Sequence, residues 1–198
     1  MHIEYEATFI NIDKTRMREI LKEKGGELVH PEFLQKRVVF NLPKEQKIEG
    51  GWIRIRDEGN KITMSLKIIS GDKIENQKEI CLRVDNFKEA EELLIFLGCD
   101  KKAYQENKRE LWRINDVEVT IDEWPFLEPF VEVEGNSEEE VKQVSEKLGF
   151  LYQDALFCSV DTLYSKKYNI PKEVINNETP KIVFDMENHF EKMSNNKK

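Results

Sequence analysis

The sequence predicts an α+β protein in which eight antiparallel β-strands carry helices packed against one of their faces. Apolar and polar residues alternate with period two over eight short segments, which is typical of strands with one buried face. The turn sequences "DEGN" (57–60) and "RIND" (113–116) join neighbouring segments closely, so these strands run antiparallel. Amphipathic helical segments interrupt the strands, and no parallel crossover pattern repeats along the chain.

The strands are expected near 2–9, 33–41, 52–57, 61–69, 77–84, 107–114, 117–123 and 129–134. Helices are expected over 13–25, 86–98, 137–149 and around 160–169. The third helix has the clearest boundaries, because Ser137 with Glu140 three residues later is a capping box and Gly149 ends the apolar stripe.

Length and composition favour one domain with a charged surface, a charged interior, or both. The 198 residues suit a single domain over 1–180 and a polar tail over 181–198 that is expected to fray. A net charge of −8 argues against nucleic acid or an anionic membrane as a partner of the whole surface. The three cysteines are Cys81, Cys99 and Cys158, and without a C-x-x-C pair they indicate reduced thiols in a cytoplasmic protein. The sequence predicts neither a signal peptide nor a membrane span.

Two architectures fit the alternating strands. In one, an open sheet packs its apolar face on the helices and exposes its charged face to water. In the other, the strands close into a barrel, so that helices cover the apolar outside and the charged faces point into a lumen. Alternation alone favours the open sheet, since sheets with one solvated face are common.

The identity of the polar residues favours the barrel. The polar strand faces are rich in arginine, at positions 37, 54, 56, 83, 109 and 113, and they carry the paired carboxylates Glu4/Glu6 and Glu132/Glu134. Arginine suits bidentate contacts with phosphate, and paired carboxylates repel each other unless a cation lies between them. Burying such a set requires a ligand or water, and a wet lumen that takes a polyanion and a metal would supply both.

The first half of the chain carries a series of short motifs in a recognisable order. The first strand, "EYEAT", resembles an E-x-E-x-K pattern, with Thr8 at the lysine position. "QKRVVF" resembles Q-x-D before an aromatic residue, with Arg37 at the acid position. "WIRIR" resembles L-R-x-R, "TMSLK" resembles T-x-K and ends at Lys67, and "KEICLR" supplies Glu79 as the following acid.

The second half continues the series. "NKRELW" resembles K-x-R-x-x-aromatic, with Asn107 at the lysine position and Arg109 in place. "VTIDEW" supplies Asp122, and "FVEVE" resembles F-x-E-x-E with Glu132 and Glu134. Over residues 2 to 165 the ordered set resembles the CYTH domain family of class IV adenylate cyclases and thiamine triphosphatases, also called triphosphate tunnel metalloenzymes.

This resemblance implies an eight-stranded antiparallel barrel, open at both ends, with helices on the outside. It implies a divalent Mg²⁺ or Mn²⁺ ion as cofactor, bound by carboxylates and substrate phosphates. The expected metal ligands are Glu4, Glu6, Asp122, Glu132 and Glu134. The expected substrate-binding residues are Arg37, Arg54, Arg56, Lys67, Arg83, Arg109 and Arg113. Among these, Arg54, Arg56 and Lys67 are expected to be catalytic, because phosphoryl transfer depends mainly on positioning and charge stabilisation.

Three functions remain open on this basis. Attack by water on the terminal phosphorus would make the protein a hydrolase of a triphosphate-bearing small molecule. Attack by a ribose 3′-hydroxyl on the α-phosphorus would make it an adenylate cyclase. A domain that binds phosphate without turnover is the third reading, prompted by Thr8 and Asn107 at the two lysine positions. A homodimer is compatible with the sequence.

Overall fold

The structure is a computed structural model that describes residues 1–46 and 48–195. Its strands are β1 (His2–Ile3), β2 (Tyr5–Phe9), β3 (Glu27–Asn41), β4 (Gly51–Asp57), β5 (Ile62–Ile69), β6 (Gln77–Val84), β7 (Asp100–Ile114), β8 (Val117–Glu123), β9 (Phe130–Gly135) and β10 (Lys181–Ile182). Its helices are α1 (Lys14–Glu23), α2 (Phe87–Phe96), α3 (Glu138–Lys147), α4 (Val160–Tyr168), α5 (Lys172–Asn177) and α6 (His189–Asn195), with short 3₁₀ turns at Ile74–Asn76 and Tyr152–Asp154.

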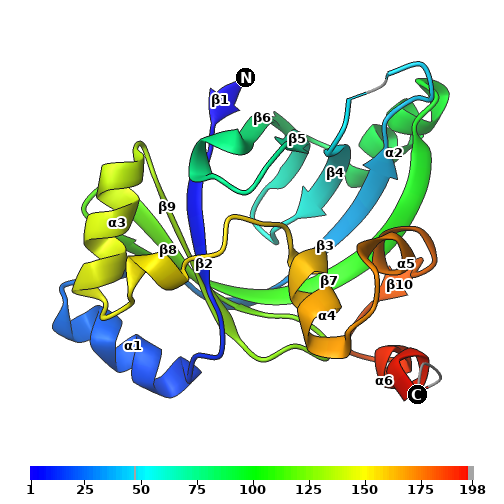
Figure 1. The fold of residues 1–198 in the computed structure, drawn as a ribbon. Coiled ribbons are helices and arrows are strands. Elements are labelled where there is room, and N and C mark those ends of the chain that lie inside the picture. The colour runs from blue at the N-terminus through cyan, green and yellow to red at the C-terminus, as the bar shows by residue number, and fades with distance from the viewer. Residues whose placement is uncertain (47, 196–198) are drawn as a thin grey trace.

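Nine strands form a nearly closed antiparallel barrel, which confirms the predicted fold class. The strands lie in the order β1-β6-β5-β4-β3-β7-β8-β9-β2. Because β1 and β2 follow each other in the chain, the N-terminal segment joins the two ends of this order (Figure 1). The count is nine rather than eight because the strand predicted over 2–9 is interrupted at Glu4, with β1 pairing with β6 and β2 with β9.

The two longest strands exceed their predicted lengths. β3 and β7 pair with each other from Glu27 to Asn41, with register shifts that include the segment around His30. These irregularities break the period-two pattern on which the sequence-based boundaries depend. β10 pairs with β7 in parallel and lies outside the barrel order.

The outer, apolar face of the barrel is covered by α1, α2 and α3. α1 and α3 pack Leu21 and Val141 against Val119 and Val133 of β8 and β9. α2 packs Leu94 against a separate cluster on β3 and β4. Asp13 and Ser137 accept hydrogen bonds from the backbone N–H groups of the first turns of α1 and α3 and so fix where these helices begin. Every helix among the described residues is too short or too polar to cross a lipid bilayer.

The segment after Pro180 packs against the domain, so the expectation that it frays is wrong for residues 181–195. Ile182, Val183 and Phe190 are buried, and the ring of Phe190 packs against those of Tyr164 and Tyr168 of α4. These buried side chains hold the segment to the domain, although the apolar residues of 181–195 lack the periodicity that predicts an element. The last predicted tail residues, 196–198, lie outside the described residues.

Candidate functional site

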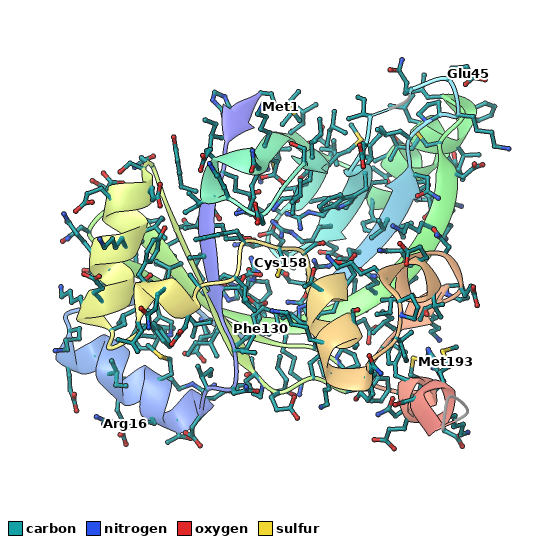
Figure 2. The ribbon with its side chains drawn as sticks, viewed as in Figure 1. Met1, Arg16, Glu45, Phe130, Cys158 and Met193 are labelled. Carbon is teal, nitrogen blue, oxygen red and sulfur yellow. The ribbon has the colours of Figure 1, made fainter. Side chains whose placement is uncertain are left out.

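The polar faces of the barrel strands enclose a cavity of about 1320 Å³. Its lining includes side chains from β2, β3, β4, β5, β6, β7 and β9, together with residues from the segment after α3. That segment passes across the barrel opening, where Cys158 lies (Figure 2). The closed arrangement of strands therefore turns the charged faces into a lumen.

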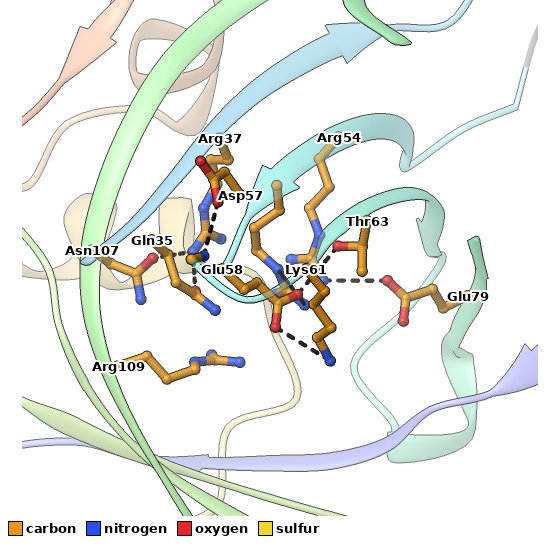
Figure 3. Close-up of polar contacts among 12 residues, drawn as sticks. Gln35, Arg37, Arg54, Asp57, Glu58, Lys61, Thr63, Glu79, Asn107 and Arg109 are labelled. Atoms are coloured by element: carbon orange, nitrogen blue, oxygen red, sulfur yellow. Dashed lines mark hydrogen bonds and ion pairs between the residues drawn. The ribbon is translucent and has the colours of Figure 1, made fainter. Parts of the chain in front are cut away.

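Three arginines crowd one wall of this cavity. Arg37 on β3 lies directly opposite Arg56 on β4, and Arg54 lies two residues from Arg56 on the same face. Figure 3 shows Arg37 and Arg54 with polar side chains around them. We call these three residues the arginine cluster. Like charges directly opposite each other destabilise a sheet, so the barrel bears a cost to assemble them. Burial and then the neighbouring Arg54 lower the pKa of Arg56.

Arg37 is the most unusual member of the arginine cluster. It is 5% exposed and donates hydrogen bonds to the side-chain oxygens of Gln35, at 3.0 Å, and Asn107. Its guanidinium lies 4.5 Å from the centre of the Trp124 ring. The structure pairs it with no carboxylate among the described residues. Burial, followed by repulsion from Arg54 and Arg56, lowers the pKa of Arg37 well below its ordinary value.

The other two arginines have carboxylate partners. Arg54 contacts Glu79 at 3.2 Å, and Arg56 contacts Glu58 at 2.8 Å. The Nε atoms of Arg37 and Arg54 are buried without a hydrogen-bond partner. Buried donors are normally satisfied, so these two point to an anionic group that would complete the cluster.

Three carboxylates gather on the other side of the lumen. Ligand oxygens of Glu4, Glu6 and Glu134 all lie within 4.8 Å of one another, because Glu6 and Glu134 face each other across the β2–β9 pair. We call these residues the acid cluster. Lys67 reaches it from β5, with its Nζ 2.6 Å from an oxygen of Glu4. Three converging carboxylates offer the oxygen ligands that Mg²⁺ and Mn²⁺ prefer, so the residues present fit a divalent cation.

The acid cluster carries more negative charge than its surroundings stabilise. Burial, and then the charge of Glu132, raise the pKa of Glu6 well above its ordinary value. Burial and the charge of Glu4 raise the pKa of Glu134 to about 7. Burial and Arg54 lower the pKa of Lys67, but the carboxylates around it raise the pKa above its ordinary value overall. A cation is therefore the group that this cluster lacks electrostatically.

Asp122 and Glu132 are bound to Arg109 instead. Arg109 donates to both oxygens of Asp122, at 2.9 and 2.8 Å, and also to Glu132. Asp122 is fully buried and further accepts a hydrogen bond from Asn107 at 2.6 Å. The five acids predicted as metal ligands thus separate into the acid cluster and a pair that holds Arg109.

The structure does not bring Arg83 and Arg113 to the cavity. Both are exposed, and neither lines the lumen. Arg113 instead pairs with Glu118 at 3.0 Å, with nearly half of each side chain exposed. Both residues have the correct alternation, but they lie near strand ends, where the same face opens to solvent.

Several residues of the site had no role assigned from the sequence. Gln35 and Asn107 are fully buried between Arg37 and Asp122, and their alternation with Arg37 and Arg109 could have placed them in the lumen. Glu58 follows β4 in a turn, where periodicity gives no signal. Thr8 is 2% exposed, and its backbone pairs with Leu156 on the segment that crosses the opening.

Comparison with known proteins agrees with this arrangement. A sequence model of the CYTH domain matches residues 2–163. A protein of Methanocaldococcus jannaschii, provisionally named an adenylate cyclase, is 27% identical over 171 residues, covering 84% of this chain and 96% of that protein.

Solved structures share the fold at low sequence identity. A provisionally named adenylate cyclase from Vibrio parahaemolyticus superposes with a TM-score of 0.70 at 11% identity, covering 83% of this chain and 98% of the other. A provisionally named adenylyl cyclase from Hippeastrum, described as having a dominant triphosphatase activity, superposes with a TM-score of 0.53 at 13% identity, covering 86% of this chain and 99% of the other. Because the family match spans most of the sequence and the charged barrel agrees with it, this chain belongs to the CYTH domain family.

Proposed function

We propose that this chain is a divalent-metal-dependent phosphohydrolase acting on a triphosphate-bearing substrate inside the barrel. The observation that carries the proposal is the arginine cluster: Arg37 and Arg56 face each other across neighbouring strands, and Arg37 has no carboxylate partner among the described residues. Like charges are held together in a buried site only where something compensates for their repulsion. A chain of phosphates would do so, since each phosphate matches the donor geometry of a guanidinium.

The acid cluster supports the metal dependence. Glu4, Glu6 and Glu134 would hold Mg²⁺ or Mn²⁺ together with phosphate oxygens. When bound, the metal supplies positive charge to the phosphate oxygens next to it. Arg109 keeps Glu132 and Asp122 occupied, so these two acids would act by orienting Arg109 toward the lumen.

The basic residues would bind and orient the substrate and stabilise charge during the reaction. Arg37, Arg54 and Arg56 would bind successive phosphate oxygens along one wall. Lys67 lies between the two clusters, bound to Glu4 and within the field of Arg54. It is therefore placed to contact a phosphate that also touches the metal. Preorganised charges of this kind lower the barrier to phosphoryl transfer without reorganising during the reaction.

Adenylate cyclase is the second candidate, favoured by the name of the Methanocaldococcus jannaschii relative. It would use the same charged residues but would also require a site for adenine and for the ribose 3′-hydroxyl.

One panel of assays separates these functions. Purified protein is incubated with tripolyphosphate, thiamine triphosphate and ATP, with and without Mg²⁺ or Mn²⁺. Release of orthophosphate that depends on metal supports the hydrolase, whereas cyclic AMP and pyrophosphate support the cyclase. Binding without turnover of any of the three would contradict both enzymatic functions.

A further inference from the structure

Lys67 contacts the acid cluster at the place where the proposed metal would bind. Its Nζ lies 2.6 Å from an oxygen of Glu4, and the side chains of Lys67 and Glu4 are only 9% and 8% exposed. Glu4 is also one of the three carboxylates whose ligand oxygens lie within 4.8 Å of one another. The ammonium group and a cation bound among these carboxylates would therefore lie close together, with little water between them.

One ammonium group does not balance the acid cluster. Lys67 brings a single positive charge to three carboxylates. Burial and the charge of Glu4 still raise the pKa of Glu134 to about 7, although Lys67 opposes the shift. A divalent cation would balance the carboxylates better, but it would repel an ammonium group held against Glu4, and buried charges are poorly screened. Lys67 and a divalent cation therefore compete for Glu4.

The strands give the Lys67 side chain a second position in the lumen. Lys67 on β5 lies opposite Glu79 on β6, and Glu79 holds Arg54 of the arginine cluster at 3.2 Å. Arg54 lies opposite Ser65, two residues from Lys67, so Arg54 and Lys67 are diagonal neighbours that both line the cavity. A lysine has a flexible four-carbon stem. Rotation about its side-chain bonds would therefore carry the ammonium group from Glu4 toward the arginine cluster.

From these observations we propose that Lys67 is an exchangeable counter-ion that couples the two clusters. In the metal-free protein its ammonium group binds Glu4. When a divalent cation binds the acid cluster, Lys67 leaves Glu4 and turns toward the arginine cluster, where it binds a phosphate oxygen of the substrate. Metal and phosphate binding then strengthen each other by the same factor, because linkage is reciprocal. The inference rests on the proposed function, since it takes the acid cluster as the metal site and the arginine cluster as the phosphate site.

Calorimetry measures this coupling without turnover. The anion is the methylene analogue of tripolyphosphate, in which CH₂ groups replace the bridging oxygens and prevent hydrolysis. Its affinity is measured without metal and with saturating Mg²⁺, corrected for the Mg²⁺ that the analogue binds in solution, and the ratio of the two affinities is the coupling factor. We expect Lys67→Gln to lower this factor about tenfold and to bind Mg²⁺ alone about tenfold more tightly than the wild type.

A second substitution separates exchange from a general effect of charge. Arg54→Gln removes one positive charge from the same lumen, and Arg54 pairs with Glu79 rather than with the acid cluster. It should weaken binding of the analogue by similar factors with and without Mg²⁺, leaving the coupling factor as in the wild type. A lysine that stayed on Glu4 throughout would behave in the same way, so an unchanged coupling factor in Lys67→Gln would overturn the inference.

Crystal structures of the wild type test the exchange without any substitution. The Nζ of Lys67 should lie within hydrogen-bond distance of Glu4 in the metal-free protein. It should lie more than about 4 Å from Glu4 once Mg²⁺ occupies the acid cluster, which is beyond the limit of an ion pair. A Lys67–Glu4 contact that persists with Mg²⁺ bound would overturn the inference.

The outcomes separate this inference from the proposed function. Metal-dependent hydrolysis together with an unchanged coupling factor in Lys67→Gln would overturn the exchange and leave the phosphohydrolase standing. A lowered coupling factor in a protein that turns over neither tripolyphosphate, thiamine triphosphate nor ATP would contradict the phosphohydrolase and support the exchange. Failure of the analogue to bind with or without Mg²⁺ would contradict both.

Discussion

Arg37 and Arg56 occupy opposed positions on β3 and β4, so that two guanidinium groups project into one cavity from neighbouring strands. A fourth arginine of the lumen, Arg109, differs from Arg37 in its partners. Arg109 binds Asp122 and Glu132, which raise its pKa well above the ordinary value against the opposing effect of burial. Arg37 binds two neutral amides, and its pKa is lowered. The two arginines of one lumen therefore differ in charge balance: carboxylates neutralise Arg109, whereas the partners of Arg37 are neutral.

Replacing Arg37 should weaken substrate binding without a large loss of stability. Arg37→Gln removes a cation from the proposed phosphate site, and a charge-assisted hydrogen bond contributes about 1.5–3 kcal/mol. We therefore expect tripolyphosphate affinity to fall about tenfold or more, as measured by calorimetry. The free energy of unfolding should change little, because removing Arg37 also relieves its repulsion with Arg54 and Arg56. Arg16→Gln on the exposed face of α1 is the matched control.

Replacing Arg109 should reduce both the affinity for tripolyphosphate and the free energy of unfolding. Arg109→Gln leaves Asp122 buried without its cation, and breaking a buried ion pair of this kind costs about 3–5 kcal/mol. Urea unfolding of the two arginine variants under identical conditions measures the contrast. A loss of stability in Arg37→Gln as large as that in Arg109→Gln would show that Arg37 is structural.

The acid cluster should give the metal-free protein a characteristic pH dependence. The pKa of Glu134 is about 7 in the folded protein, above its ordinary value of 4.5. Between these values the folded state binds a proton that the unfolded state has lost, so the free energy of unfolding falls as the pH rises through this window. The shift corresponds to a decrease on the order of 3 kcal/mol.

Glu134→Gln should remove this part of the pH dependence. The measurement is urea unfolding of wild type and variant without metal from about pH 5 to about pH 8, with the exposed Glu139→Gln on α3 as control. The difference between wild type and Glu134→Gln should grow across this range, since only the wild type must ionise the buried carboxylate. Parallel curves for the two proteins would contradict the raised pKa. Mg²⁺ binding requires the ionised form and should strengthen with pH and level off above about 7.

Asn107 connects the two differently paired arginines. Its amide oxygen accepts from Arg37, and its amide nitrogen donates to Asp122 at 2.6 Å. Asn107→Asp would replace the neutral partner of Arg37 with a carboxylate and place a second negative charge beside Asp122. We expect the new ion pair to compete with phosphate, raising the KM for a triphosphate about tenfold and affecting kcat less. Asn60→Asp, in the exposed β4–β5 turn, is the control; a fall in kcat alone would exclude this positioning role.

The barrel was predicted from the identity of the polar residues and the family resemblance, and alternation along the strands then placed most of the lumen residues. Arg37, Arg54, Lys67 and Glu134 were placed correctly because a strand's period of two decides which face each side chain occupies. The same rule does not say how far along the barrel a residue lies. Arg83 is exposed for this reason, although it shares the alternation of buried residues.

The division of the carboxylates could not be predicted from alternation either. Asp122 and Glu132 lie on two neighbouring strands and meet Arg109 on a third, so their pairing depends on the register between strands and not on sequence spacing. The helix predicted around 160–169 is α4, but the part that α4, α5 and β10 take in lining the cavity was missed, because α5 and β10 are short and irregular. Their burial results from contacts between residues distant in sequence, which local patterns do not record.

The packing of the segment after Pro180 against α4 can be tested directly by substitution. Phe190 is fully buried, with its ring 4.8 Å from that of Tyr164, which lines the cavity from α4. Phe190→Ala should lower the free energy of unfolding by about 3–5 kcal/mol, because it removes a buried aromatic side chain and leaves a cavity. Urea unfolding measures the change. Phe96→Ala on α2 removes the same side chain from a position that is 89% exposed, and it should change stability by less than about 0.5 kcal/mol. If both variants unfold like the wild type, the segment after Pro180 does not pack on the barrel, and the support that it gives to Tyr164 is absent.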